Sequence, residues 1–148
     1  MIVSSSTDLY KWALYGFLKK RGVEIPRSED FQAIGRLSPL TKDLIGVVGY
    51  NGFCGQVCSM HMAGDGNWIN RQLLWAAFDY PFNQAKCVQV FATVAETNYK
   101  ALKLNLHLGF KTIGLVPNGW AEGVNLILLT MNKRDCRWLE KKHELKVA

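Results

Sequence analysis

Two side chains near the middle of the chain are candidates for acid–base chemistry. His61 lies in an apolar, strand-like run, 53–62, and an imidazole with its ordinary pKa of about 6.5 suits a general base close to pH 7. Glu96 follows a second apolar run, 88–94, and strands of α/β sheets often present ligand groups where they end. Each side chain also has a purely structural interpretation: His61 as a half-buried hydrogen-bonded group, and Glu96 as a capping or surface acid.

The cysteines offer little as metal ligands. Cys54 and Cys58 are four residues apart in a predicted strand, so their side chains face the same way. A structural zinc site needs further ligands, usually a second close pair, and His61 alone does not supply them. We therefore expect no metal site and interpret all the cysteines as reduced thiols that pack as small apolar groups.

The composition indicates one globular domain, 1–148. The chain has 148 residues, of which 49% are hydrophobic and 20% charged, as in ordinary soluble domains. No apolar run reaches the roughly 18 residues that a membrane helix needs. The N-terminal residues lack the basic and long apolar regions of a signal peptide. These features predict a cytoplasmic protein.

The charge balance favours an anionic partner. The formal net charge is +6, and basic residues gather at the end of a predicted N-terminal helix and in the stretch 132–148. Such a balance is typical of proteins that bind nucleic acid or a phosphorylated cofactor. The simpler interpretation is a mildly basic solvated surface.

The elements that position these side chains alternate along the chain. A helix is predicted from Asp8 to about Lys20, and a strand from Phe31 to Leu37. Asn51-Gly52 predicts a hairpin with a type I′ turn between strands 44–50 and 53–62. A helix over 68–80 is expected to end at Pro81. The remaining predicted strands are 88–94, 112–116 and 125–131. The loop 117–124 contains Trp120 and Glu122, and serves either as a substrate-facing flap or as an ordinary hairpin end.

Residues 96–110 form the most informative segment. The alternation of leucines at 102, 104, 106 and 108 is typical of a strand. However, β-branched residues are absent from 98 to 110, Ala and Leu favour helix, Asn98 can cap a helix, and Gly109 can stop it. We therefore predict a helix. The resulting fold is α/β (or α+β): a mixed central sheet of about six strands with helices on both faces and a right-handed crossover.

This layout resembles the C-terminal half of the GNAT superfamily of N-acetyltransferases, in which an Asn opens the fourth helix and a Gly-Phe closes it. The corresponding residues are Asn98, Gly109 and Phe110, and the resemblance covers roughly 40–132. The stretches 75–84 and 135–139 also resemble small phage-encoded GNAT-like proteins, for which the cytoplasm would be that of the host. The resemblance implies transfer of an acetyl group from acetyl-CoA to an amine on a small molecule or macromolecule.

The resemblance also implies where the cofactor binds. In the family, strands four and five diverge around the pantetheine arm, and the pyrophosphate lies on N–H groups at the start of the next helix. The family's glycine-rich phosphate motif aligns with 65–70. There Asp65 would repel the pyrophosphate, Trp68 would crowd it, and Arg71 is the nearby compensating charge. A register shifted to 61–66 keeps both glycines but puts His61 first. The implied cofactor-binding residues are Met60, Met62, Asn67, Trp68, Ile69, Asn70, Arg71 and Asn98.

The implied catalytic residues are His61, Glu96 and Asn105. Family members commonly place a tyrosine acid seven residues after the helix-opening Asn; here that position is Asn105, which can donate a hydrogen bond but not a proton. Two alternatives stay open. One is a GNAT-fold protein that modifies or binds nucleic acid without standard use of acetyl-CoA, and the other is a catalytically inactive interaction module. The late hairpin is also compatible with a homodimer.

Overall fold

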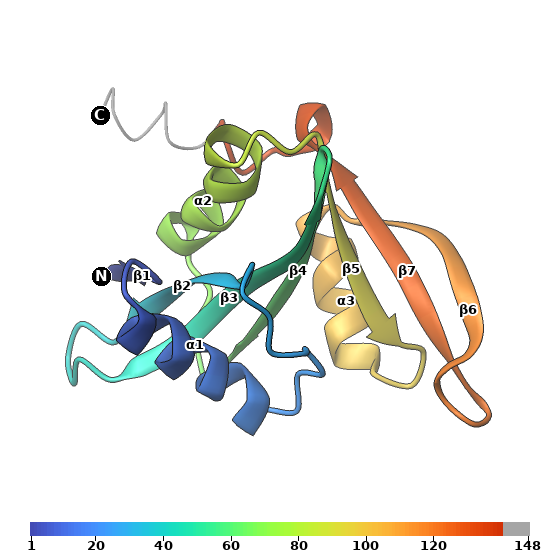
Figure 1. Ribbon diagram of the computed structural model, residues 1–148, viewed down its shortest axis with the longest axis horizontal. Helices are drawn as coiled ribbons and strands as arrows, with labels where there is room; N and C mark the ends of the chain where they lie inside the picture. The colour runs from blue at the N-terminus through green and yellow to red at the C-terminus, as the bar shows by residue number, and fades with distance from the viewer. Residues whose placement is uncertain (141–148) are drawn as a thin grey trace.

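The protein folds around one twisted sheet. The structure, a computed structural model, describes residues 1–140, so the part of the basic stretch 132–148 from position 141 on lies outside the described residues. Within the described range, strands lie in the order β1-β2-β3-β4-β5-β7-β6 (Figure 1). The strands are β1 (Ile2–Ser4), β2 (Gln32–Leu37), β3 (Leu44–Cys54), β4 (Val57–Gly64), β5 (Gln89–Ala95), β6 (Lys111–Ala121) and β7 (Val124–Asn132).

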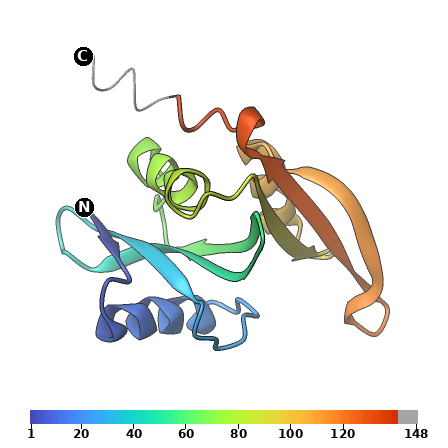
Figure 2. The same cartoon turned by 45° about the horizontal axis from the view of Figure 1, so that its top comes forward.

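Helices cover both faces of this sheet. They are α1 (Asp8–Lys20), α2 (Arg71–Asp79), a π-helical turn η1 (Tyr80–Gln84), α3 (Tyr99–Leu108) and a 3-10 turn η2 (Lys133–Asp135). Figure 2 shows α1 on one face and α2 on the other. All neighbouring strands pair antiparallel except β4 and β5, which α2 connects. The predicted fold class is confirmed.

Each face has its own core. On one face, Leu14 and Leu18 of α1 belong to a buried cluster with Phe31, which directly precedes β2. The larger core lies on the opposite face, where the rings of Phe78 in α2 and Phe110 after α3 approach to 6.2 Å. Because both of these residues belong to the same buried cluster, α2 and α3 lie on one side of the sheet and flank the parallel strand pair.

The segment 96–110 is a helix, as predicted. The side-chain oxygen of Asn98 accepts a hydrogen bond from the N–H of Ala101 at 3.2 Å, and Gly109 adopts φ +114°, the left-handed conformation that ends many helices. Thr7 likewise caps α1. The alternating leucines do not form a strand because helix propensity and both caps agree on the same boundaries.

The strands differ from the predicted ones in three places. The β3–β4 turn is at Gly55-Gln56 rather than Asn51-Gly52: Cys54 pairs with Val57, and Gly52 lies in a bulge between them and the Asn51–Ser59 pair. The sheet also has the additional strand β1, whose three residues are too few to show a pattern. Finally, β6 and β7 extend through most of the predicted loop 117–124 and leave only Glu122-Gly123 as the turn.

The predicted helix 68–80 is displaced. It begins at Arg71, because the side chain of Asn70 accepts a hydrogen bond from the N–H of Leu73 and caps it. Pro81 does not end the helical path, because the chain continues as η1. The carbonyl of Ala77, which an N–H at position 81 would bond in an α-helix, accepts from the phenol of Tyr50 at 2.6 Å instead.

Candidate acyl-transfer site

The parallel strands β4 and β5 separate part of the way along. They are paired only over Val57–Ser59 and Gln89–Phe91, although β4 continues to Gly64 and β5 to Ala95. Beyond these pairs, the backbone groups of each strand that face the other have no strand partner. An extended ligand with amide groups can therefore bind between them as a strand would.

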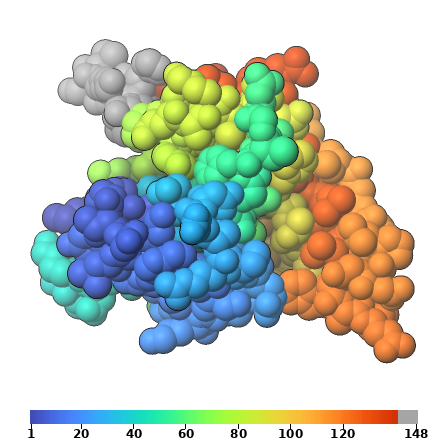
Figure 3. All heavy atoms as spheres, in the orientation of Figure 1, coloured from blue at the N-terminus to red at the C-terminus, as the bar shows by residue number. Residues whose placement is uncertain are grey.

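A cavity of about 200 Å³ lies in this gap. Its walls come from the ends of β4 and β5, the first turns of α3, the segment after α1, and Trp120 of β6. Figure 3 shows the β6–β7 hairpin (orange) standing away from the α1 side of the molecule (blue), with yellow atoms of the central elements set back between them. The cavity thus has walls from segments far apart in the sequence.

His61 lines this cavity from β4. Its Nε2 donates a hydrogen bond to Oδ1 of Asn51 at 2.8 Å, which leaves Nδ1 with its lone pair. Burial lowers the pKa of His61 to about 4, because the charged imidazolium would lose its hydration. The imidazole is therefore neutral at pH 7 and can accept a hydrogen bond there, but it is a weak base.

The lowered pKa of His61 predicts a pH dependence of stability. Between about pH 4 and the unfolded pKa of about 6.5, the unfolded chain binds more protons than the folded one. The free energy of unfolding is therefore unaffected by His61 protonation above about pH 6.5, and it decreases as the pH falls from there towards 4. From pH 7.5 to pH 5, wild type should lose about 2 kcal/mol more stability than His61→Gln. Urea denaturation of both proteins at both pH values measures this. Identical pH dependence would show that His61 titrates normally.

Asn98, directly before α3, and Asn105 within α3 reach the same cavity. Asn98 does so while capping the helix. Asn105 is 7% exposed, and its Nδ2 donates to the carbonyl of Ala101 at 2.8 Å. One Nδ2 hydrogen and Oδ1 of Asn105 remain for a ligand.

The β4–α2 loop is held by two arginines. Arg21, at the end of α1, donates from Nε to Oδ1 of Asp65 at 2.9 Å and forms a second bond to the other carboxylate oxygen. Arg36 of β2 donates to the carbonyl of Asn67 at 2.8 Å. The expectation that Arg71 is the compensating charge is therefore corrected: Asp65 is neutralised by Arg21, which lies 44 positions away in the sequence.

Trp68 belongs to the core. Its side chain is 9% exposed and lies flat on two glycines: a Cβ added at Gly64 would be 2.1 Å from Cγ of the indole, and one at Gly46 would be 2.6 Å from Cε3. The indole is therefore packed against the sheet and does not crowd the outer face of the loop. Only its backbone N–H remains a candidate for the phosphate.

The structure brings together five of the predicted site residues around the cavity: Met60, His61, Met62, Asn98 and Asn105. The loop residues Asn67, Ile69, Asn70 and Arg71 lie at the start of α2 and do not line it. Glu96 directly follows β5 and does not line the cavity, so its catalytic role stays a prediction.

Sequence reasoning missed three polar residues at the cavity. Arg21 and Glu24 follow α1, and Thr93 belongs to β5; all three line the cavity. Glu24, Thr93 and Trp120 also line the adjoining hollow at its mouth. The only signal for Arg21 was its basic charge at a helix end, and no pattern singles out Glu24 or Thr93.

Within residues 1–140, no group of three or more His, Cys, Asp or Glu side chains is placed to hold a metal ion. Over the same residues, no helix has the length and apolar character required to cross a membrane.

Comparison with solved structures identifies the fold. No protein-family model and no curated protein matches the sequence. Among solved structures, a point mutant of spermidine N-acetyltransferase from Vibrio cholerae matches with a TM-score of 0.72 at 15% identity, over 96% of this chain and 99% of that chain. Ribosomal-protein-S5-alanine acetyltransferase from Vibrio fischeri matches with a TM-score of 0.70 at 15% identity, over 92% and 94%.

A dodecameric structure of the Vibrio cholerae spermidine N-acetyltransferase matches with a TM-score of 0.69 at 14% identity, over 90% of this chain and 93% of that chain. These similarities establish that the chain has the fold of the GNAT acetyltransferases. They do not bear on the resemblance to phage-encoded proteins, which stays a prediction.

Proposed function

We propose that this protein transfers an acetyl group from acetyl-CoA to an amine by direct attack. The observation that carries the proposal is the separation of β4 from β5 after Ser59 and Phe91, with a cavity in the gap. Two of the structural neighbours are a spermidine N-acetyltransferase and a ribosomal-protein-S5-alanine acetyltransferase. Their names support an amine as the acceptor.

The residues present fit the donor. The unpaired backbone of Met60 to Ala63 can bind the amide groups of a pantetheine arm. N–H groups at the start of α2 and its positive dipole end favour the pyrophosphate. The Arg21–Asp65 pair removes most of the repulsion that a free carboxylate would exert on that pyrophosphate.

The site residues divide the work around an attacking amine. Acetyl-CoA supplies a thioester whose carbonyl carbon forms the new C–N bond while the C–S bond breaks. The neutral imidazole of His61 accepts a hydrogen bond from the amine and orients its lone pair. Glu24, exposed at the mouth, attracts the cationic amine, which loses one proton to water before it attacks as the neutral amine. Glu24 then receives the proton released on formation of the C–N bond and passes it to water. Asn105 cannot protonate the leaving thiolate, and it stabilises the thiolate by donating a hydrogen bond from its amide.

The acceptor class is tested by mass spectrometry. The full chain is incubated with acetyl-CoA and, separately, with spermidine, a peptide with an N-terminal alanine, or no acceptor. N-acetylated product should form with an amine, and Glu24→Gln should raise KM for the acceptor by about tenfold. Absence of product with every amine would favour the alternatives of a nucleic-acid-binding protein or an inactive module, which both stay predictions.

The Arg21–Asp65 pair makes a second prediction. Arg21→Gln should weaken acetyl-CoA binding by roughly tenfold or more, because it exposes the Asp65 carboxylate to the pyrophosphate. Adding Asp65→Asn to that variant should restore most of the affinity. Titration calorimetry on the two single variants and the double variant measures the coupling. Additive effects of the two substitutions would contradict the proposed neutralisation.

A further inference from the structure

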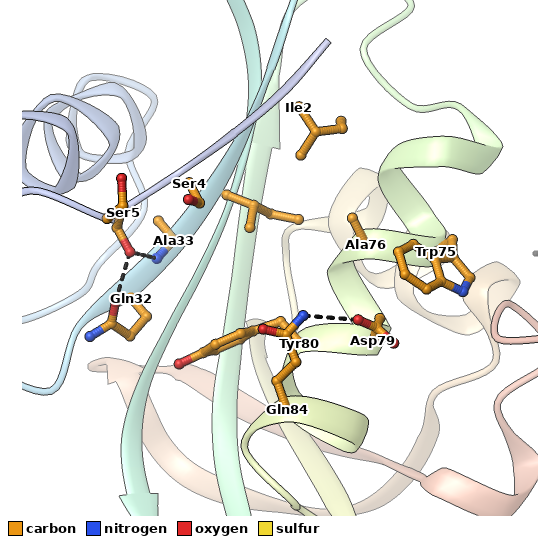
Figure 4. A pocket seen from close by; sticks show the side chains of 12 residues that line it. Ile2, Ser4, Ser5, Gln32, Ala33, Trp75, Ala76, Asp79, Tyr80 and Gln84 are labelled. Carbon is orange, nitrogen blue, oxygen red and sulfur yellow. Dashed lines mark hydrogen bonds between the residues drawn. The ribbon is translucent and has the colours of Figure 1, made fainter.

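A second cavity lies at the C-terminal end of α2. It has a volume of about 370 Å³ and lies between β1 and β2 on one side and the end of α2 and η1 on the other. Figure 4 shows Ser5 and Gln32 on one side and Ala76, Asp79 and Gln84 on the other. None of its lining residues lines the acyl-transfer cavity, so any ligand here is separate from the donor and acceptor proposed above.

The polar side chains on the strand side, three serines and Gln32, are all neutral. The hydroxyl of Ser5 donates to Oε1 of Gln32 at 2.8 Å and accepts from the N–H of Ala33 at 2.9 Å. Apolar side chains, including Ile2, Ile34 and Ala76, complete that part of the wall. Recognition of a ligand charge must therefore come from the helix side.

The helix side carries one charge. Asp79 is the only ionisable acid or base, apart from the phenol of Tyr80, among the lining residues. Its carboxylate accepts from Nδ2 of Asn83 at 2.8 Å and from Nε2 of Gln84 at 2.9 Å. Both donors are neutral, and within residues 1–140 no basic side chain pairs with it. These two bonds fix the carboxylate, but no described side chain compensates its charge, and about half of its lone-pair positions have no described partner.

The surroundings of Asp79 also favour a cation. The last turn of α2, which Asp79 ends, has no basic residue, so no cation of this helix competes for the carboxylate. The ring of Tyr80 is fixed against Tyr50 with centroids 4.9 Å apart and supplies an aromatic wall of the kind that binds ammonium groups. A carboxylate, an aromatic ring and an apolar floor together match an ammonium on a short hydrocarbon chain.

We propose that this cavity is a binding site for a small alkylammonium ion, with the ammonium on Asp79 and the hydrocarbon along Ile2, Ile34 and Ala76. An anion would be repelled by Asp79. A neutral alcohol of the same length would gain the apolar contacts without the charge-assisted hydrogen bonds, and so would bind more weakly.

Three probes of equal chain length test this proposal: n-butylammonium, n-butanol and butyrate, each titrated into the full chain labelled with ¹⁵N. The tryptophan indole N–H resonances are followed, with Trp75 and Trp120 assigned by Trp75→Phe and Trp120→Phe. Trp75 reports this cavity and Trp120 the acyl-transfer cavity. Butylammonium should shift the Trp75 resonance saturably, and the two other probes should shift it at least tenfold more weakly.

The variants separate charge from shape. Asp79→Asn should weaken the Trp75 response by about tenfold or more, whereas Asp43→Asn, an exposed acid on another loop, should not change it. Ala76→Leu, which fills the cavity, should abolish the response even if Asp79→Asn does not fold. Three results would overturn the proposal: a response at Trp120 only, an equal response to butanol or butyrate, or an unchanged response in folded Asp79→Asn. A response at Trp75 without acetyl transfer would leave this site standing and reject the proposed enzyme function.

Discussion

Replacing Trp68 by alanine is expected to lower the free energy of unfolding by about 3–5 kcal/mol. The indole is 9% exposed and fills the space above Gly46 and Gly64, so its removal would leave a cavity over both glycines. Urea denaturation followed by circular dichroism measures the change. Trp120→Ala is the matched control, because that indole is 47% exposed, and it should cost about 1 kcal/mol or less.

The same packing predicts the behaviour of Gly64. Gly64→Ala alone should be strongly destabilising, since its methyl group would overlap the indole of Trp68. Combined with Trp68→Ala, it should cost far less than the sum of the two changes. Trp68→Ala should also weaken acetyl-CoA binding rather than strengthen it, because the indole anchors the β4–α2 loop from beneath. A loss below about 1 kcal/mol in Trp68→Ala would contradict this placement of the side chain.

Ala101→Trp is expected to reduce acetyl-CoA-dependent acetylation by about 100-fold or more, a loss of at least about 2.7 kcal/mol of transition-state stabilisation. Ala101 of α3 lines the cavity in the gap between β4 and β5, and an indole at this position would occupy much of its volume of about 200 Å³. Steady-state kinetics measure the effect.

The control for that variant is its neighbour in the helix. Lys100→Trp introduces the same side chain at an exposed position that does not line the cavity, and it should leave turnover within about twofold of wild type. Thermal unfolding establishes whether Ala101→Trp is folded at the assay temperature. Full activity in folded Ala101→Trp would place the acyl-transfer site elsewhere.

The local features of the fold were predictable from the sequence. Thr7 and Asn98 cap their helices and Gly109 ends α3, because each of these effects depends only on neighbouring residues. The β3–β4 turn was not predictable in the same way. Asn51 is 9% exposed and bonded to His61, and this long-range contact keeps it in the strand instead of the turn that Asn-Gly favours.

The candidate site was predicted only in part for the same reason. His61, Asn98 and Asn105 lie on elements that sequence patterns identify, and they meet at the cavity. The role of Arg21 depends on an ion pair with Asp65 across the fold, and the position of Trp68 depends on two glycines in different strands. Neither arrangement leaves a periodic pattern or a local motif in the sequence.

Titration calorimetry with acetyl-CoA tests the central proposal most directly. The proposal predicts saturable binding of one acetyl-CoA per chain to wild type and to Lys100→Trp, with binding to folded Ala101→Trp weakened by about 100-fold or more. No detectable binding to wild type at millimolar acetyl-CoA, or equal binding to Ala101→Trp, would contradict a donor site between β4 and β5.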